Sequence, residues 1–336
     1  MKLYLILYIF IIFLTVLLIS CLNNFDSMNI AIKTKGLPED DLMNPSIYFI
    51  SKDTGYICLS KCGEVEHDNY EVNTYLYETK DGGLNWSNVA FLPGQDVNTM
   101  VANPETVFLT THAREQGQMS IYRYNINDKS IDTIFNCDAI SSIWLDNSTL
   151  FFCETNNINK LLTAEKDSIK EQLILIDYIN SGITIDGQVF AIFSNNKTNY
   201  FGDTKLSYQL PMTPDCLIRK NENTILIAGP SKTHDKNTSI KLVEFDCKTK
   251  QSKTIKVFDG YSYIDDLQSA GDIIVGFIGN MSSSIIEYDL FYSIDSGKKW
   301  KIIEMEDPVW IRPNCLMGDN LIIYKGFNQI DKILLK

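Results

Sequence analysis

One short phrase recurs along the chain: a turn-forming polar residue or glycine, followed by three or four residues that favour β-strands. The seven copies are centred on Tyr56, Val107, Leu150, Val189, Ile225, Ile273 and Leu321. Consecutive centres are 36 to 51 residues apart, which brackets the roughly 40 to 50 residues that four antiparallel strands and their turns occupy in a propeller blade. We therefore expect an all-β chain folded as a seven-bladed β-propeller, with six or eight blades as alternatives. The phrase would be the second strand of each blade.

The segments between these phrases also read as short strands. Runs of Ile, Val, Tyr and Phe alternate with Asn, Asp, Gly, Ser and Lys, and 161–177 is the one stretch that could be taken as helical. Turn residues follow it as they follow the other runs, so we predict a strand there too. A two-sheet sandwich is the other all-β arrangement, but it would not explain seven similar intervals.

Two further segments suggest how the ring closes. Pro214-Asp-Cys-Leu and Pro313-Asn-Cys-Leu precede two of the phrases at similar distances, which predicts that both begin inner strands. The last repeat has room for only two or three strands, whereas the alternating segment 30–36 precedes the first blade. We expect this N-terminal strand to complete the last blade, so that 29–336 form a single propeller domain without open sheet edges at the seam.

The N-terminus reads as an export signal. Residues 1–20 contain one Lys and a long apolar run, and Leu18-Ile-Ser-Cys21 resembles the lipobox of bacterial lipoproteins. The resemblance implies a cleaved signal peptide over 1–20, a lipidated Cys21, and a short linker over 21–28. Acyl chains would then hold the protein to the membrane, and Leu22 would favour the outer membrane, facing the periplasm or the cell surface. An uncleaved anchor is the alternative, because the apolar run is near the ~18-residue limit for spanning a bilayer.

Charge and cysteine content narrow the partners and cofactors. The chain has a formal charge of −12, which argues against nucleic acid as a partner. Its three His are far apart, so no metal or other cofactor is predicted. Cys58 and Cys62 are the one close pair of the mature chain and could form a disulfide in an oxidising compartment. The alternative is that the cysteines are small buried apolar residues.

A more specific motif occurs twice, with the pattern Ser/Thr-x-Asp-x-Gly-x-x-Trp. Its residues are Thr79, Asp81, Gly83 and Trp86 in the first copy, and Ser293, Asp295, Gly297 and Trp300 in the second. In a tight turn the carboxylate can accept backbone N–H groups, the glycine supplies a positive φ, and the Trp packs against the strands. The motif resembles the Asp-box, or bacterial neuraminidase repeat, of sialidase-like propellers. This resemblance implies a structural role at the turn between the third and fourth strands, away from the catalytic face.

The sialidase-like resemblance does not extend to catalytic residues. Sialidases hold the substrate carboxylate with an arginine triad, a geometry that Lys cannot reproduce. The chain has only four Arg, at positions 114, 123, 219 and 312, and it lacks the early Phe-Arg-Ile-Pro signature. We therefore predict no catalytic residues. A glycosidase that needs only two carboxylates stays open, because the chain has 42 acidic residues.

The remaining candidates lie where inner strands are expected to begin, or in the loops beside them. We predict that they form a binding face, and they are Asp96, Arg114, Tyr261, Asp265, Trp310 and Arg312, with Tyr263 and Asp266 nearby. The expected function is a monomeric, lipid-anchored, non-catalytic module that binds another protein. That partner would be a basic toxin, if the chain is an immunity protein, or an envelope complex, if it is an assembly factor. The alternative is a lipoprotein that binds or hydrolyses glycans.

Overall fold

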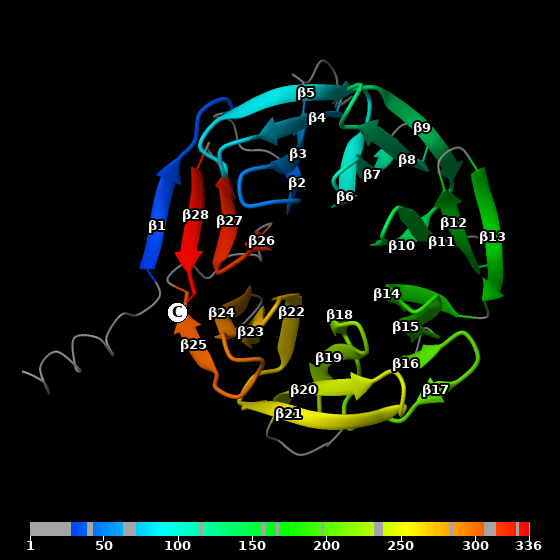
Figure 1. Ribbon diagram of the computed structural model, residues 1–336, viewed down its shortest axis with the longest axis vertical. Coiled ribbons are helices and arrows are strands. Elements are labelled where there is room, and N and C mark those ends of the chain that lie inside the picture. The colour runs from blue at the N-terminus through cyan, green and yellow to red at the C-terminus, as the bar shows by residue number, and fades with distance from the viewer. Residues whose placement is uncertain are drawn as a thin grey trace, which may run out of the picture.

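Seven four-stranded antiparallel sheets form a closed ring in the computed structural model (Figure 1). The structure describes residues 28–38, 43–62, 72–113, 117–155, 159–165, 168–175, 177–195, 198–231, 238–282, 285–305, 314–326 and 329–335. Within these ranges every element is a strand. The predicted all-β, seven-bladed propeller is therefore confirmed.

The first four blades follow one another along the chain. Blade 1 consists of β2 (Met43–Phe49), β3 (Gly55–Cys62), β4 (Val72–Thr79) and β5 (Trp86–Leu92). Blade 2 consists of β6 (Asp96–Ala102), β7 (Thr106–Ala113), β8 (Gln118–Asn125) and β9 (Ile131–Cys137). Blade 3 consists of β10 (Ile140–Asp146), β11 (Thr149–Thr155), β12 (Asn159–Glu165) and β13 (Ser168–Leu175). Blade 4 consists of β14 (Tyr178–Ile185), β15 (Gln188–Ser194), β16 (Asn199–Asp203) and β17 (Ser207–Tyr208).

The last three blades complete the ring. Blade 5 consists of β18 (Cys216–Asn221), β19 (Thr224–Pro230), β20 (Ser239–Asp246) and β21 (Gln251–Asp259). Blade 6 consists of β22 (Tyr263–Ala270), β23 (Ile273–Ser282), β24 (Ile285–Ser293) and β25 (Lys301–Glu304). Blade 7 consists of β26 (Asn314–Met317), β27 (Asn320–Gly326), β28 (Gln329–Leu334) and, as its outer strand, β1 (Met28–Lys33).

The strand predictions agree with this order. All seven repeated phrases lie at the second strand of a blade, β3, β7, β11, β15, β19, β23 and β27. The stretch 161–177 falls on β12 and β13, so the strand interpretation of this region is correct. Second strands are flanked by strands on both sides and by a blade on each face, which is why most of their described side chains are buried.

Ring closure uses the N-terminal strand, as predicted, because β1 pairs along its whole length with β28 (Figure 1). The chain then continues from blade 7 onto blade 1, where Lys35 N–H donates to Leu84 O (3.0 Å) and Trp86 N–H donates to Lys35 O (2.8 Å). Gly36 follows with φ +86°, and a Cβ there would lie 2.0 Å from Trp86 O. Only glycine can bring the two segments this close.

The apolar core lies between the blades rather than inside any one of them. Seven clusters of buried residues fill the seven seams. The cluster between blades 4 and 5 is the largest, with twelve buried residues around Phe190, Phe201 and Phe245. Burying such faces on both sides of each sheet holds the blades in place.

The predicted disulfide is wrong. Cys58 and Cys62 are both free and lie on the same strand, β3. Four residues of extended chain span about 13 Å, whereas the Cα atoms of a disulfide lie within about 7 Å of each other. All seven cysteines of the described ranges are free and five of them are buried, as in the alternative interpretation.

Some sequence predictions fall outside the described residues. These are the signal peptide over 1–20, the lipidation site Cys21, and the candidate binding residues Arg114, Trp310 and Arg312. Among the residues that are described, none belongs to a helix that could cross a membrane.

Candidate functional site: carboxylates at the two ends of the propeller

The strand order gives the ring two ends. We call top face the end at which each inner strand begins, and bottom face the opposite end, which carries the turns between first and second and between third and fourth strands. Aspartates occur at both ends, and their surroundings differ.

The first Asp-box motif forms the turn between β4 and β5, on the bottom face. The Asp81 carboxylate accepts the backbone N–H of Asn85 (2.9 Å) and the hydroxyl of Thr79 (2.9 Å). The same hydroxyl accepts Gly83 N–H (3.0 Å), and the Trp86 indole donates to Gly83 O (2.8 Å). Gly83 has a positive φ of 96°. These are the contacts expected of the motif from its sequence.

The second motif repeats this geometry between β24 and β25. Asp295 accepts Lys299 N–H (2.8 Å) and the Ser293 hydroxyl (2.9 Å), and that hydroxyl accepts Gly297 N–H (2.9 Å). The Trp300 indole donates to Gly297 O (2.9 Å). In both copies the aspartate, the hydroxyl and the indole make their hydrogen bonds within the motif, which supports the structural role inferred for both aspartates.

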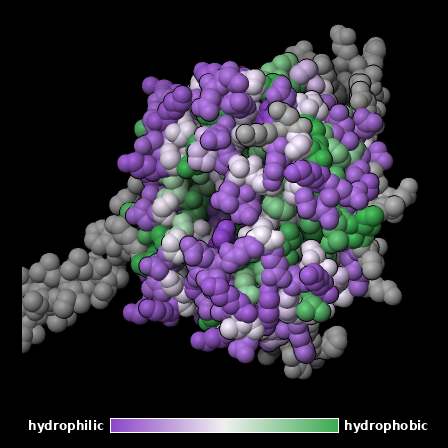
Figure 2. Space-filling model, turned by 45° about the vertical axis from the view of Figure 1, so that its right-hand side comes forward, coloured by the Kyte–Doolittle hydropathy of each residue, from purple (hydrophilic) through white to green (hydrophobic). Residues whose placement is uncertain are grey.

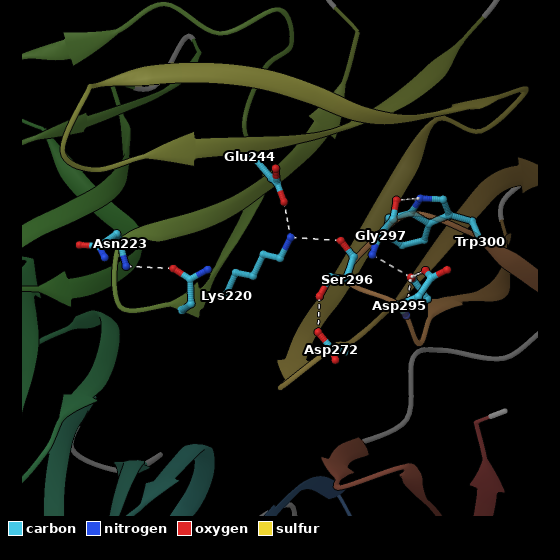
Figure 3. Close-up of polar contacts among 10 residues, drawn as sticks. Lys220, Asn223, Glu244, Asp272, Asp295, Ser296, Gly297 and Trp300 are labelled. Atoms are coloured by element: carbon cyan, nitrogen blue, oxygen red, sulfur yellow. Dashed lines mark hydrogen bonds and ion pairs between the residues drawn. The ribbon is translucent and has the colours of Figure 1, made fainter.

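The two turns differ in what holds them to the preceding blade. The first is joined through the backbone of Lys35, as described above, whereas the second is joined by a side chain (Figure 3). Lys220 of β18 places its ammonium between the Glu244 carboxylate and Ser296 O, at 3.1 Å from the latter. The Lys220 side chain is only 12% exposed, so it joins blades 5 and 6 from inside their seam.

Several aspartates of the bottom face have low pKa values. Among the aspartates that the structure describes, five have pKa values below the usual range, and each is at a turn between third and fourth strands: Asp81, Asp128, Asp203, Asp246 and Asp295. Hydrogen bonds to the charged form are the cause. At Asp128 the donors are the hydroxyl and N–H of Ser130, and at Asp246 they are led by Thr249 N–H. At Asp203 burial opposes the shift, but Tyr208 and two backbone N–H groups outweigh it and lower the pKa.

Three aspartates at the top face have raised pKa values: Asp215 lies directly before the inner strand of blade 5, and Asp265 and Asp266 lie on the inner strand of blade 6. Partial desolvation by the surrounding blades, reinforced by the charge of Asp265, raises the pKa of Asp215 to about 6. The same two causes raise the pKa of Asp266 to about 6. Desolvation also raises the pKa of Asp265 itself. Asp215 and Asp265 still face solvent, so this is a cluster of mutually repelling carboxylates at the mouth of the channel.

Asp266 has the most constrained position of the three. It lies in a β-bulge of β22 with φ +50°, a conformation that costs an aspartate roughly 1 kcal/mol or more. Its carboxylate accepts hydrogen bonds from Asn314 Nδ2 of blade 7 and from Gln268 Nε2 of its own strand. Gln268 in turn accepts Leu316 N–H (2.6 Å). These amides hold Asp266 at the seam between blades 6 and 7.

A cavity of about 520 Å³ adjoins this network in the central channel. Inner strands of five blades line it, and its polar groups include Arg219, Asp266, Gln268 and Asn314. The arrangement can therefore accept a cationic side chain or a polar ligand from the channel. Among the residues that the structure describes, no three His, Cys, Asp or Glu are grouped as a metal site would require.

The sequence-predicted binding residues are only partly brought together. Asp265 belongs to the carboxylate cluster, and Tyr261 lies just before the same strand, where its hydroxyl donates to Asp289 (2.7 Å). Asp96 begins the inner strand of blade 2 and is 8% exposed, so it belongs to another sector of the top face. Sequence reasoning missed Asp215, although it lies in the quoted segment Pro214–Leu217, and it also missed Gln268 and Asn314. An acid directly before an inner strand was the available signal for Asp215.

Comparisons with known proteins identify the fold and not a family. No protein-family model and no curated protein sequence matches the chain. Among solved structures, an uncharacterised protein of Listeria monocytogenes has a TM-score of 0.60 at 11% identity, over 91% of this chain and 98% of that one. The β-propeller domain of the Trilobed protease from Pyrococcus furiosus has a TM-score of 0.58 at 12% identity (84% and 90% covered). An oligogalacturonate lyase in complex with manganese has a TM-score of 0.58 at 9% identity, over 93% of this chain and 98% of that one. Likeness at these identities shows that the chain has a β-propeller fold, and nothing about what it binds.

Proposed function

We propose that this chain is a lipid-anchored envelope protein of the Asp-box type, and that its top face binds another protein without catalysing a reaction. The binding role rests on one observation, the group of three carboxylates with raised pKa at the channel mouth: Asp215, Asp265 and Asp266. Because these like charges repel one another, a partner that places a cation among them is bound favourably. Cys21, if lipidated, would hold the propeller at the membrane surface.

The chemistry of the site favours a basic partner. A Lys or Arg side chain that enters the channel mouth would relieve the repulsion within the cluster, and the net charge of −12 would steer a basic protein toward the chain. A basic toxin neutralised by an immunity protein fits this description, and so does a basic subunit of an envelope complex that an assembly factor holds.

The test is a capture experiment from envelope extracts at low salt. The wild-type chain is compared with a top-face variant, Asp215→Asn, Asp265→Asn and Asp266→Asn combined, and with a charge-matched bottom-face variant, Asp128→Asn, Asp246→Asn and Asp295→Asn combined. Asparagine keeps an oxygen that can accept the N–H groups of each turn. We expect the same basic protein to be captured by the wild type and by the bottom-face variant, but not by the top-face variant. Capture by all three chains, or by none, would contradict the proposal.

A second candidate function has a specific observation in its favour. Asp266, with a pKa near 6, lines a cavity large enough for a sugar ring. Asp215 does not line this cavity, but desolvation and the charge of Asp265 raise its pKa to about 6 as well. A carboxyl group of raised pKa suits a general acid. Turnover of an oligosaccharide that Asp215→Asn or Asp266→Asn abolishes would favour a glycoside hydrolase over a binding module. Binding without turnover would instead favour a glycan-binding protein.

A further inference from the structure

A groove on the perimeter of the ring, between blades 3 and 4, is separate from the top-face site. It consists of two adjoining hollows of about 430 and 710 Å³. Both are lined by Leu173 of β13 and by Thr204 and Lys205 of the turn before β17, so they form one continuous groove. Asp177 lies at its top-face end and Asp186 at its bottom-face end.

The groove is open because blade 4 ends early. Its outer strand, β17, has two residues, whereas the neighbouring β13 has eight. The cluster between these blades also has only seven buried residues, the smallest of the seven seam clusters found in the described ranges. Four apolar or aromatic residues that pack on this cluster remain partly exposed and form the floor of the groove: Phe151, Leu173, Leu175 and Tyr200.

The rim of the groove carries exposed apolar side chains. Leu206 and Ile174 are 63% and 60% exposed, the highest values among the exposed large hydrophobic residues of the described chain, and both line the smaller hollow. Figure 2, in which the side of blades 3 and 4 is turned forward, shows apolar patches within a mostly hydrophilic surface. Two large apolar side chains on opposite sides of one hollow are typical of an interaction surface.

Acidic side chains outnumber basic ones around the groove. The described residues that line it include one cation, Lys205, and five acids: Asp146, Glu165, Asp177, Asp186 and Asp203. Arg219 pairs with Asp146, and Lys170 with Glu165. The partner of Asp177, however, is the neutral hydroxyl of Tyr200 (2.6 Å), and no cation of the described ranges forms an ion pair with it. A ligand of this groove should therefore carry positive charge beside its apolar groups.

We propose that the groove between blades 3 and 4 binds an extended segment of a partner protein in which apolar residues alternate with Lys or Arg. The apolar side chains would enter the smaller hollow beside Ile174 and Leu206 and the larger hollow over Phe151 and Leu173, and the cations would lie near Asp177 and Asp186. β13 is the outermost strand of its sheet, so its free edge offers backbone donors and acceptors to an extended chain. The site does not share residues with the top-face carboxylates, and each proposal can fail without the other.

Synthetic peptides provide the probe. A fluorescein-labelled peptide that alternates leucine and lysine is titrated with the full-length chain in nanodiscs of phosphatidylcholine, with empty nanodiscs as the blank. One control peptide has glutamate for lysine, and another has serine for leucine. Fluorescence anisotropy should report saturable binding of the first peptide alone, because the groove selects both charge and apolar character.

Matched variants locate the binding. Ile174→Ser with Leu206→Ser should weaken binding on the order of tenfold, since two apolar contacts are removed. Val257→Ser with Ile302→Ser is the control, because these side chains are also exposed, at 37% and 45%, but lie on β21 and β25. All four positions are on the surface, so circular dichroism should show intact folds. A benzophenone on the peptide should crosslink to β13 and to 204–207. No saturable binding, an equal loss in both variants, or crosslinks at the channel mouth would overturn the proposal.

Discussion

The two ends of this propeller use the same residue type in opposite ways. At the bottom face, aspartates accept hydrogen bonds from their own turns, and their pKa values fall. At the top face, three aspartates of blades 5 and 6 are desolvated and close together, and their pKa values rise. A carboxylate that accepts hydrogen bonds from its own turn stabilises the fold. A carboxylate held beside another carboxylate can instead interact with a ligand. The position of an aspartate within its blade therefore separates structural from candidate functional residues.

A smaller contrast exists between the two Asp-box turns themselves. Their internal hydrogen bonds are nearly identical, but one turn is joined to its neighbour by the backbone of Lys35 and the other by the ammonium of Lys220. The first connection lies at the seam between blades 7 and 1, where the ring closes. Gly36 allows the two backbone segments to approach each other there, because it has no Cβ. The second joins two blades that are already consecutive in sequence. One turn motif thus serves two kinds of seam.

The largest loss of stability is expected when the buried indole of the first Asp-box turn is removed. Trp86→Ala should lower the free energy of unfolding by about 3–5 kcal/mol, because the indole is 5% exposed and packs in the seam between blades 7 and 1. Urea denaturation measures this change. Leu84→Ala, in the same turn but 48% exposed, is the matched control and should cost little. Equal losses for the two variants would mean that the turn is not a structural element.

The next effect tests the top face through pH. The pKa of Asp266 is about 6 in the folded protein and about 4 in an unfolded chain, so the folded state binds the proton more tightly. The stability linked to this group is full below pH 4 and is lost as the pH rises through 6. Asp266→Asn should therefore raise the free energy of unfolding at pH 7 by about 1–3 kcal/mol and flatten its dependence between pH 4 and 6. Destabilisation at pH 7 would show that the charged form of Asp266 supports the fold.

A smaller effect separates the two Asp-box turns. Lys220→Met should cost about 1–2 kcal/mol, since it leaves Glu244 unpaired in a partly buried position and Ser296 O without its donor. Lys52→Met, in the exposed turn between β2 and β3, is the control. Thermal unfolding of both variants measures the difference. If Lys220→Met is as stable as Lys52→Met, the side chain does not join blades 5 and 6.

The smallest effect concerns the exposed turn acids. Asp128→Asn and Asp246→Asn keep an acceptor oxygen and should change stability little at pH 7. The lowered pKa values of these aspartates give stability that is present above pH 4 and lost as the pH falls through the folded pKa. Acid titrations of unfolding should therefore be flatter below pH 4 in the variants than in the wild type. A change confined to the range between pH 4 and 6 would contradict the contrast between the two ends.

The sequence predicts the fold well because the repeat depends on local physics. Each second strand is buried on both faces, so phrases such as those around Val107 and Ile225 must be apolar, and their spacing reflects the length of a blade. The Asp-box turns are predictable for the same reason, since Thr79 to Trp86 make their contacts within eight residues. Ring closure is predictable as well, because the last repeat has too few residues for four strands and an extra strand precedes the first blade.

The candidate site is less predictable because it depends on contacts between blades. Asp266 meets Asn314 across 48 positions of sequence, and the β-bulge in which it lies has no sequence signature. Asp215 meets Asp265 across the seam between blades 5 and 6. The disulfide prediction failed for a related reason, because spacing alone does not reveal that Cys58 and Cys62 share one extended strand.

The most direct measurement of the central contrast is a carboxyl titration by NMR. With aspartate side chains labelled with ¹³C, the carboxyl shifts of Asp215 and Asp266 are followed against those of Asp128 and Asp246, with each signal assigned from its Asn variant. The account predicts midpoints near pH 6 for the top-face pair and below pH 4 for the bottom-face pair. Four midpoints within the ordinary range of an exposed aspartate would contradict it.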